Sequence, residues 1–260
     1  MKKYFSIGKI NFLNNINYFG EFFFKSVFIL LILFIFANLW KVIFAGGNAL
    51  PGYTVAMMVW YMLMTESIVT SSPNNVREIN QDIQSGEIAY KLNKPYNYVF
   101  YYLAKSLSYS IIGFFVTFLI GGILVYFLVG GISFNLVNTG FLIISVLLAM
   151  VLSFVMMTCI SLLAFWFEDT NSLKWIYDKI LFTVGGMLVP LEVFPLWLAK
   201  ISEVLPFSFV AYYPARLFVN FNLMDFLRVT GIQLVYIGVF LIIALVIYKA
   251  GIRRVNINGG

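Results

Sequence analysis

The residue types that most often carry catalysis are scarce in this chain of 260 residues. It contains no histidine, the commonest general base and metal ligand. Its one cysteine, Cys159, lies within an apolar run, so no disulfide can form within the chain, and we expect a small buried side chain there. No glycine-rich phosphate loop ending in Gly-Lys-Ser/Thr occurs, so the chain has no P-loop of its own for a nucleotide. The charged groups are therefore better suited to binding than to covalent chemistry.

Charged residues gather in one polar segment, residues 71–97. Within it, Val76, Ile79 and Ile83 recur at helical spacing and predict a short amphipathic helix. The face that we expect to meet water carries Arg77, Glu78, Gln81 and Asp82. Gly86 then allows a sharp turn. This helix is either a connector lying on the lipid headgroups or a docking helix that presents Glu78, Asp82 and Glu87 to a cytoplasmic partner.

Two polar side chains stand out because they lie inside apolar runs. Glu66 follows a long apolar stretch, and an ionised group within a bilayer is normally paired or faces a cavity. It is either a residue of a transport pathway or a structural carboxylate near the headgroups, paired with a basic side chain. Asn38 either lines a polar path or hydrogen-bonds a neighbouring helix.

The composition requires a membrane. Of all residues, 62% are hydrophobic and only 11% are charged, whereas soluble domains are about half apolar and a quarter charged. The net charge of +6 comes from single cations at the ends of apolar runs, which indicates topology rather than nucleic-acid binding.

The hydropathy pattern predicts an all-α membrane protein with six transmembrane helices in a single domain, residues 1–260. We expect crossings at residues 26–45, 53–70, 101–129, 139–166, from about 175 onward, and 227–248. An interfacial helix precedes them at residues 1–25. Placing both termini in the cytoplasm leaves only Lys41, Lys200, Arg216 and Arg228, of 17 Lys and Arg residues, on the outer side.

The fifth apolar run is interrupted by helix-breaking residues. Gly185, Gly186, Pro190 and Pro195 fall within or just after it, and Pro206 follows. We expect a broken helix and then short helices that re-enter the outer face over residues 193–222. Glu192 and Glu203 flank this turn with Lys200 between them, and they either guard an exit or are solvated charges.

Two runs of residues resemble a known family. The first comprises Ile79, Asp82, Gly86, Ile88, Leu92, Lys94 and Pro95. It resembles the coupling-helix region of permease subunits of ABC-2 type ABC transporters. The second, Gly-Gly-Met-Leu-Val-Pro-Leu at residues 185–191 followed by Phe-Pro at 194–195, resembles that family's fifth helix and outer re-entrant hairpin.

The resemblance implies a permease without catalytic, cofactor or metal sites of its own. Two cytoplasmic ATPase subunits would bind ATP and Mg, and a second permease, identical or a sister subunit, would complete the transporter. The coupling residues would be Arg77, Glu78, Ile79, Asp82, Ile83, Gly86, Glu87 and Lys91.

The resemblance implies export, since members of that family export lipids, glycans, drugs or peptides. We expect an amphipathic or lipid-like substrate, because the apolar crossings offer few fixed polar contacts. Two alternatives remain open at this point. One is the membrane-embedded substrate-binding component of a vitamin importer, and the other is a membrane-embedded enzyme.

Overall fold

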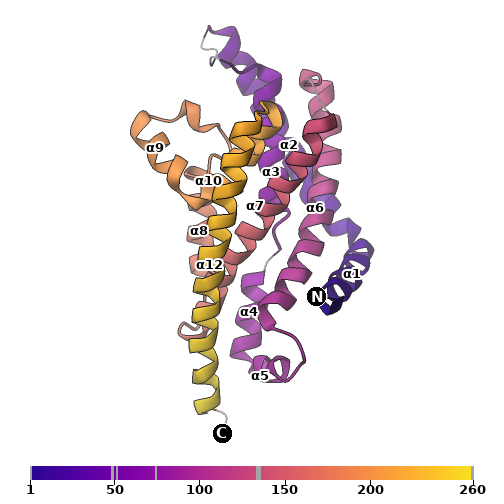
Figure 1. The fold of residues 1–260 in the computed structure, drawn as a ribbon. Helices are drawn as coiled ribbons and strands as arrows, with labels where there is room; N and C mark the ends of the chain where they lie inside the picture. The colour runs from indigo at the N-terminus through magenta and orange to yellow at the C-terminus, as the bar shows by residue number, and fades with distance from the viewer. Residues whose placement is uncertain (1, 48–49, 51, 74, 133–135, 259–260) are drawn as a thin grey trace.

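Four long helices run between the two ends of the molecule (Figure 1). They are α2 (Phe19–Ala45), α6 (Tyr98–Val129), α7 (Leu136–Leu162), which a 3-10 turn, η1 (Leu163–Phe165), extends, and α12 (Leu223–Asn258). This computed structural model describes residues 2–47, 50, 52–73, 75–132 and 136–258. Within those residues the chain is helical and contains no strand.

The four long helices are long and apolar enough to cross a membrane, each with a mean hydropathy of at least 2.5 over its most apolar window. The second and fifth predicted crossings correspond to shorter helices, α3 (Val55–Thr70) with 16 residues and α8 (Asn171–Thr183) with 13. A straight span needs about 20 residues. The prediction of a multi-pass, all-α membrane protein is confirmed, whereas six crossings stay a prediction.

Several helix boundaries differ from the predicted ones. The first helix, α1 (Lys2–Asn17), ends before residue 25, because the chain turns at Tyr18 and the remaining residues open α2. Met1 lies outside the described residues. At the other end of the chain, α12 begins at Leu223 and continues beyond Tyr248 to Asn258. Continuous helical hydrogen bonding, which hydropathy does not report, extends α12 past its apolar part.

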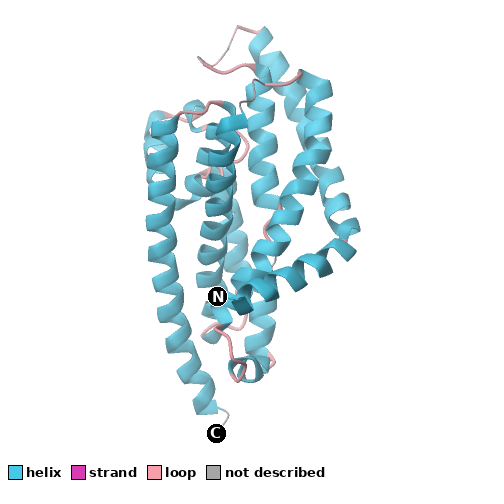
Figure 2. Cartoon of the chain, turned by 45° about the vertical axis from the view of Figure 1, so that its right-hand side comes forward, coloured by secondary structure: helices cyan, strands magenta, loops and turns pink. Residues whose placement is uncertain are grey.

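The N-terminal helix packs across α6 (Figure 2). Lys3 Nζ donates to the carbonyl oxygen of Pro95 at 2.6 Å, and the Asn97 backbone N–H donates to the Tyr4 hydroxyl at 2.9 Å. Further along, the Ser108 hydroxyl donates to the Gly8 carbonyl at 2.8 Å. These bonds fix α1 at the start of α6, beside the polar segment.

The largest packed pair is α7 with α12. Between them, the buried amide of Gln233 donates to the carbonyl oxygens of Ser145 at 3.2 Å and of Phe209 at 2.9 Å. On the other side of the bundle, α3 packs against α2, α6 and α11 (Tyr212–Val219). Helix α3 is thereby held inside the bundle, and Tyr61, Met62 and Leu63 are completely buried.

The two ends of the bundle carry different short helices. One end holds α4 (Asn75–Gln84), α5 (Glu87–Leu92) and the C-terminal end of α12, whereas α9 (Leu196–Val204) and α10 (Pro206–Val210) lie toward the opposite end (Figure 1). Residues 193–222 contain short helices, as predicted, whereas their re-entry into the outer face of the membrane stays a prediction. A further 3-10 turn, η2 (Leu191–Val193), precedes them.

Candidate functional site

The polar segment forms a helical hairpin, α4 and α5, joined by a tight turn. Val76 and Ile79 of α4 are buried, and the helix packs against α7, as the apolar stripe predicts. Gly86 has a φ of +76° at this turn, a left-handed conformation that disfavours other residues. The Ser85 hydroxyl donates to the Gln81 carbonyl at 2.7 Å, which helps to close the end of α4.

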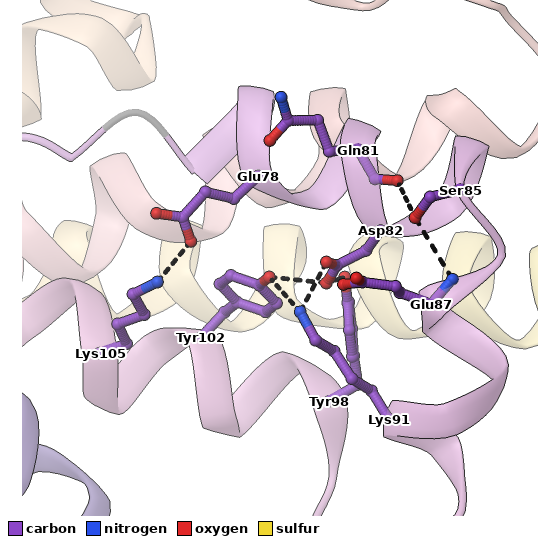
Figure 3. Close-up of polar contacts among 9 residues, drawn as sticks. All are labelled: Glu78, Gln81, Asp82, Ser85, Glu87, Lys91, Tyr98, Tyr102 and Lys105. Atoms are coloured by element: carbon purple, nitrogen blue, oxygen red, sulfur yellow. Dashed lines mark hydrogen bonds and ion pairs between the residues drawn. The ribbon is translucent and has the colours of Figure 1, made fainter.

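The centre of the site is the carboxylate of Asp82 (Figure 3). One of its oxygens accepts hydrogen bonds from the hydroxyls of Tyr98 and Tyr102, each at 2.7 Å. The other accepts from Lys91 Nζ at 2.5 Å, forming an ion pair. Only 7% of the Asp82 side chain is exposed. A buried carboxylate with three charge-assisted or hydroxyl donors is well stabilised, and it joins α4, α5 and α6 at one point.

Further polar contacts fix the hairpin to its neighbours. Lys105 of α6 pairs with Glu78 at 2.5 Å, and the Asn75 side-chain amide donates to the Ser106 hydroxyl. On the other side, the Asn80 amide donates to Asp169 in the loop before α8 at 3.2 Å. Polar contacts thus anchor the hairpin to α6 and to the loop before α8.

Beside the anchored face lies an open polar cavity of about 690 Å³ between the hairpin and α6. Its walls include Gln81, Gln84 and Glu87 from the hairpin and Tyr101 and Lys105 from α6. Ser85 also lines this cavity, and Arg77 and Tyr90 are further exposed side chains of the hairpin. The hydrogen bond from Lys94 lowers the pKa of the exposed Tyr90 hydroxyl. This surface is free to meet another protein.

The structure divides the predicted coupling residues into two groups. Arg77, Gly86 and Glu87 are exposed, whereas Glu78, Ile79, Asp82, Ile83 and Lys91 are buried or partly buried. The expectation that Asp82 faces water is wrong. It lies three residues after Ile79, at the edge of the apolar stripe, where it reaches the tyrosines of α6. Of the three acidic residues, Glu87 is exposed, and Glu78 is partly exposed and paired with Lys105.

Sequence analysis missed Tyr98, Tyr102 and Lys105 as parts of the site. Their spacing offered a signal, since Tyr98 and Tyr102 are four residues apart and occupy one face of a helix. The start of that helix is fixed by Asn97, whose side-chain oxygen accepts from the backbone N–H groups of Val99 and Phe100. This capped start directs both hydroxyls toward α4.

The polar residues of the apolar runs have different surroundings. Glu66 is buried, with 2% exposed, and within the described part of the chain no basic side chain forms an ion pair with it. The interpretation as a paired structural carboxylate is therefore wrong for this chain alone. Asn38 is exposed and donates to the Phe34 carbonyl of its own helix at 2.8 Å, and its place in a polar path stays a prediction.

The predicted break in the fifth apolar run is confirmed at Gly185 and Gly186. Gly186 has a φ of +71°, and an added Cβ would lie 3.0 Å from the Cβ of Tyr212. Its carbonyl accepts from the Tyr61 hydroxyl, and the next carbonyl, Met187, accepts from the Thr65 hydroxyl at 2.6 Å. These bonds satisfy the backbone where α8 has ended and fasten the turn to α3.

After this turn, prolines mark the starts of the short elements. Pro190, which is buried, precedes η2, Pro195 precedes α9, and Pro206 is the first residue of α10. Proline is favoured at such starts because its missing N–H is not needed there.

Glu192 is exposed, as a solvated charge would be, and neighbouring side chains also hold it in place. One carboxylate oxygen accepts from the hydroxyls of Tyr212 at 2.7 Å and Tyr53 at 3.1 Å. Arg216 Nε lies 3.3 Å from the same oxygen. The Glu203 side chain is also exposed.

A bundle of long apolar helices with an anchored helical hairpin at one end defines a membrane transport subunit. The family model of the ABC-2 family transporter proteins matches residues 27–259. The chain belongs to this family, whose members are membrane components of ABC transporters, and membership implies an ABC ATPase partner. No curated protein matches the chain.

Proposed function

We propose that this chain is the permease subunit of an ATP-driven exporter, with the α4–α5 hairpin as the coupling element that docks on a separate ATPase subunit. The observation that carries this proposal is the Asp82 cluster. It joins the hairpin to α6 through buried contacts while the face with Arg77, Gln81 and Glu87 remains exposed.

The mechanism follows from that geometry. An ATPase bound to the exposed face would push the hairpin when it closes on ATP, and the buried contacts would pass the movement to α6. ATP and Mg would bind in that partner. The complete transporter would contain two ATPase copies and a second permease, either identical or a sister chain, with six crossings and cytoplasmic termini in each permease.

The direction of transport and the class of substrate are part of the same proposal. A cavity of about 340 Å³ opens between α6 and α7, lined mostly by apolar residues such as Phe114, Phe118 and Met150. Such walls suit an amphipathic, lipid-like, drug or peptide substrate carried out of the cytoplasm.

The two alternative functions, a vitamin-importer component and a membrane-embedded enzyme, are disfavoured for separate reasons. The vitamin-importer component is disfavoured by the family match and by the long α4–α5 hairpin. A membrane-embedded enzyme would need a reactive group, and the chain has no histidine to serve as a base.

The test is co-purification from mild detergent, followed by identification of bound chains and an ATPase assay. The variant exchanges two exposed charges of the hairpin, Arg77→Glu with Glu87→Lys. The matched control exchanges two exposed charges at the start of α2, Glu21→Lys with Lys25→Glu, and keeps the same net charge. We expect an ATPase subunit to travel with the wild type and the control and to be lost from the hairpin variant. A wild-type chain that purifies without any nucleotide-binding partner would overturn the proposal.

A further inference from the structure

A second polar cavity lies at the opposite end of the bundle from the hairpin. It has a volume of about 300 Å³ and is formed by η2, α9, α11 and α12. Its lining combines apolar side chains, among them Phe194 and Leu196, with several charged groups. Nothing in the coupling mechanism uses this cavity.

Some charges of the cavity are already satisfied by one another. Arg216 lies 3.3 Å from Glu192 and 3.7 Å from Asp225, so this cation is shared by two carboxylates. These two ion pairs link η2, α11 and α12 at one wall of the cavity. These three groups are structural and leave little charge for a ligand.

Two charges of opposite sign in the same cavity remain without partners. The side chains of Glu203 on α9 and Arg228 on α12 both line it, and no ion pair or hydrogen bond of either side chain occurs in the described part of the chain. Tyr213 lines the same cavity as these two side chains. Its hydroxyl also donates to the Glu203 carbonyl at 3.3 Å, which keeps α9 next to α11.

The edge of the cavity is strongly apolar. Leu196 and Trp197 at the start of α9 are 82% and 66% exposed. An exposed tryptophan beside charged groups is typical of headgroup depth in a membrane. A ligand held by the charged pair would therefore have an apolar surface for a hydrocarbon chain within reach.

We propose that this cavity binds a zwitterionic amphiphile, with its ammonium group against Glu203, its phosphate or carboxylate against Arg228, and its chain over Leu196. A ligand with a single charge would leave one of the two partners unmatched. The proposal rests on the proposed function only for placing the cavity on the outer side of the membrane. The ligand is either a lipid of that leaflet or the exported molecule itself.

The test uses the full chain in non-ionic detergent and a soluble probe, dihexanoylphosphatidylcholine, with binding measured by calorimetry. Dihexanoylphosphatidylglycerol, which lacks the ammonium group, is the comparison ligand. We expect Glu203→Gln and Arg228→Gln each to weaken binding about tenfold, as the loss of one charge-assisted contact implies. Lys200→Gln, an exposed change outside the cavity, is the matched control and should bind like the wild type.

Unchanged binding in both cavity variants, or equal affinity for the two probes, would overturn the proposal. Native mass spectrometry of the chain taken from membranes separates the two sources. A zwitterionic phospholipid that is retained by the wild type and lost in Arg228→Gln identifies the leaflet lipid, whereas binding of the probe without retained phospholipid identifies a transported amphiphile. Both cavity variants should keep their ATPase partner, so that a failure here is distinct from a failure of the coupling proposal.

Discussion

Asp82 shows how one residue can fix the geometry of a docking element. Its carboxylate has three donors from two other helices, and its burial makes each of them important. A carboxylate in this setting is costly to leave unpaired, since burial penalises any charge without a partner. The cluster therefore fixes the position of the hairpin as well as contributing to stability.

Replacing Asp82 should destabilise the protein strongly. We expect Asp82→Ala to lower the free energy of unfolding by about 3 kcal/mol, because Lys91 and two hydroxyls would lose their shared partner. Thermal unfolding in detergent measures the change. Glu87→Gln, an exposed change on the same hairpin, is the control and should have an effect below about 0.5 kcal/mol. Equal unfolding temperatures for the two variants would show that the Asp82 cluster is not a structural anchor.

A second prediction at this scale concerns Gly186. Gly186→Ala should destabilise the chain by more than Gly47→Ala, although both glycines have a positive φ, +71° and +81°. Both changes carry a backbone penalty of about 1 kcal/mol. Only at Gly186 does the new Cβ also approach Tyr212 and Leu191, whereas nothing lies within 4 Å at Gly47. Thermal unfolding of both variants tests this, and equal losses would mean that the turn can relax away from Tyr212.

At the scale of elements, the sequence predicts what depends on local pattern. The apolar stripe of Val76 and Ile79, the break at Gly185 and the short helices after it were all accessible, because periodicity and helix-breaking residues are local signals. The partners of Asp82 and Glu192 could not be identified from such local signals. Tyr102 and Tyr53 lie 20 and 139 residues away from them, and only the packing of helices brings these pairs together.

The helix α1 gives a test of how one element is attached. The double variant Tyr4→Phe with Ser108→Ala removes two hydrogen bonds between α1 and α6. At about 1 kcal/mol for each bond, amide hydrogen exchange in α1 should become roughly 10- to 30-fold faster. Exchange in α12 is the internal control, because it does not depend on these bonds. Unchanged exchange in α1 would show that apolar contacts alone attach it.

At the scale of the whole molecule, the bundle separates two kinds of polar surface. The hairpin, with its exposed Arg77 and Glu87, lies at the end where α12 terminates, and α9 lies toward the other end (Figure 1). Such a separation suits a transporter, since energy would enter at one face and the substrate would leave at the other. The cation count that places both termini in the cytoplasm then assigns a side to each surface.

That orientation can be tested with single cysteines. In a Cys159→Ser background, which removes the native thiol, Gln84→Cys places a thiol on the hairpin and Lys200→Cys places one on α9, both at exposed positions. We expect a membrane-impermeant thiol reagent to label position 200 in intact cells, and position 84 only after the membrane is permeabilised. The permeabilised sample is the control for reactivity at each position. The reverse pattern would place the hairpin outside the cell, where no ATP-driven partner could reach it. That result would contradict both the coupling proposal and the side of the membrane assigned to the zwitterion cavity.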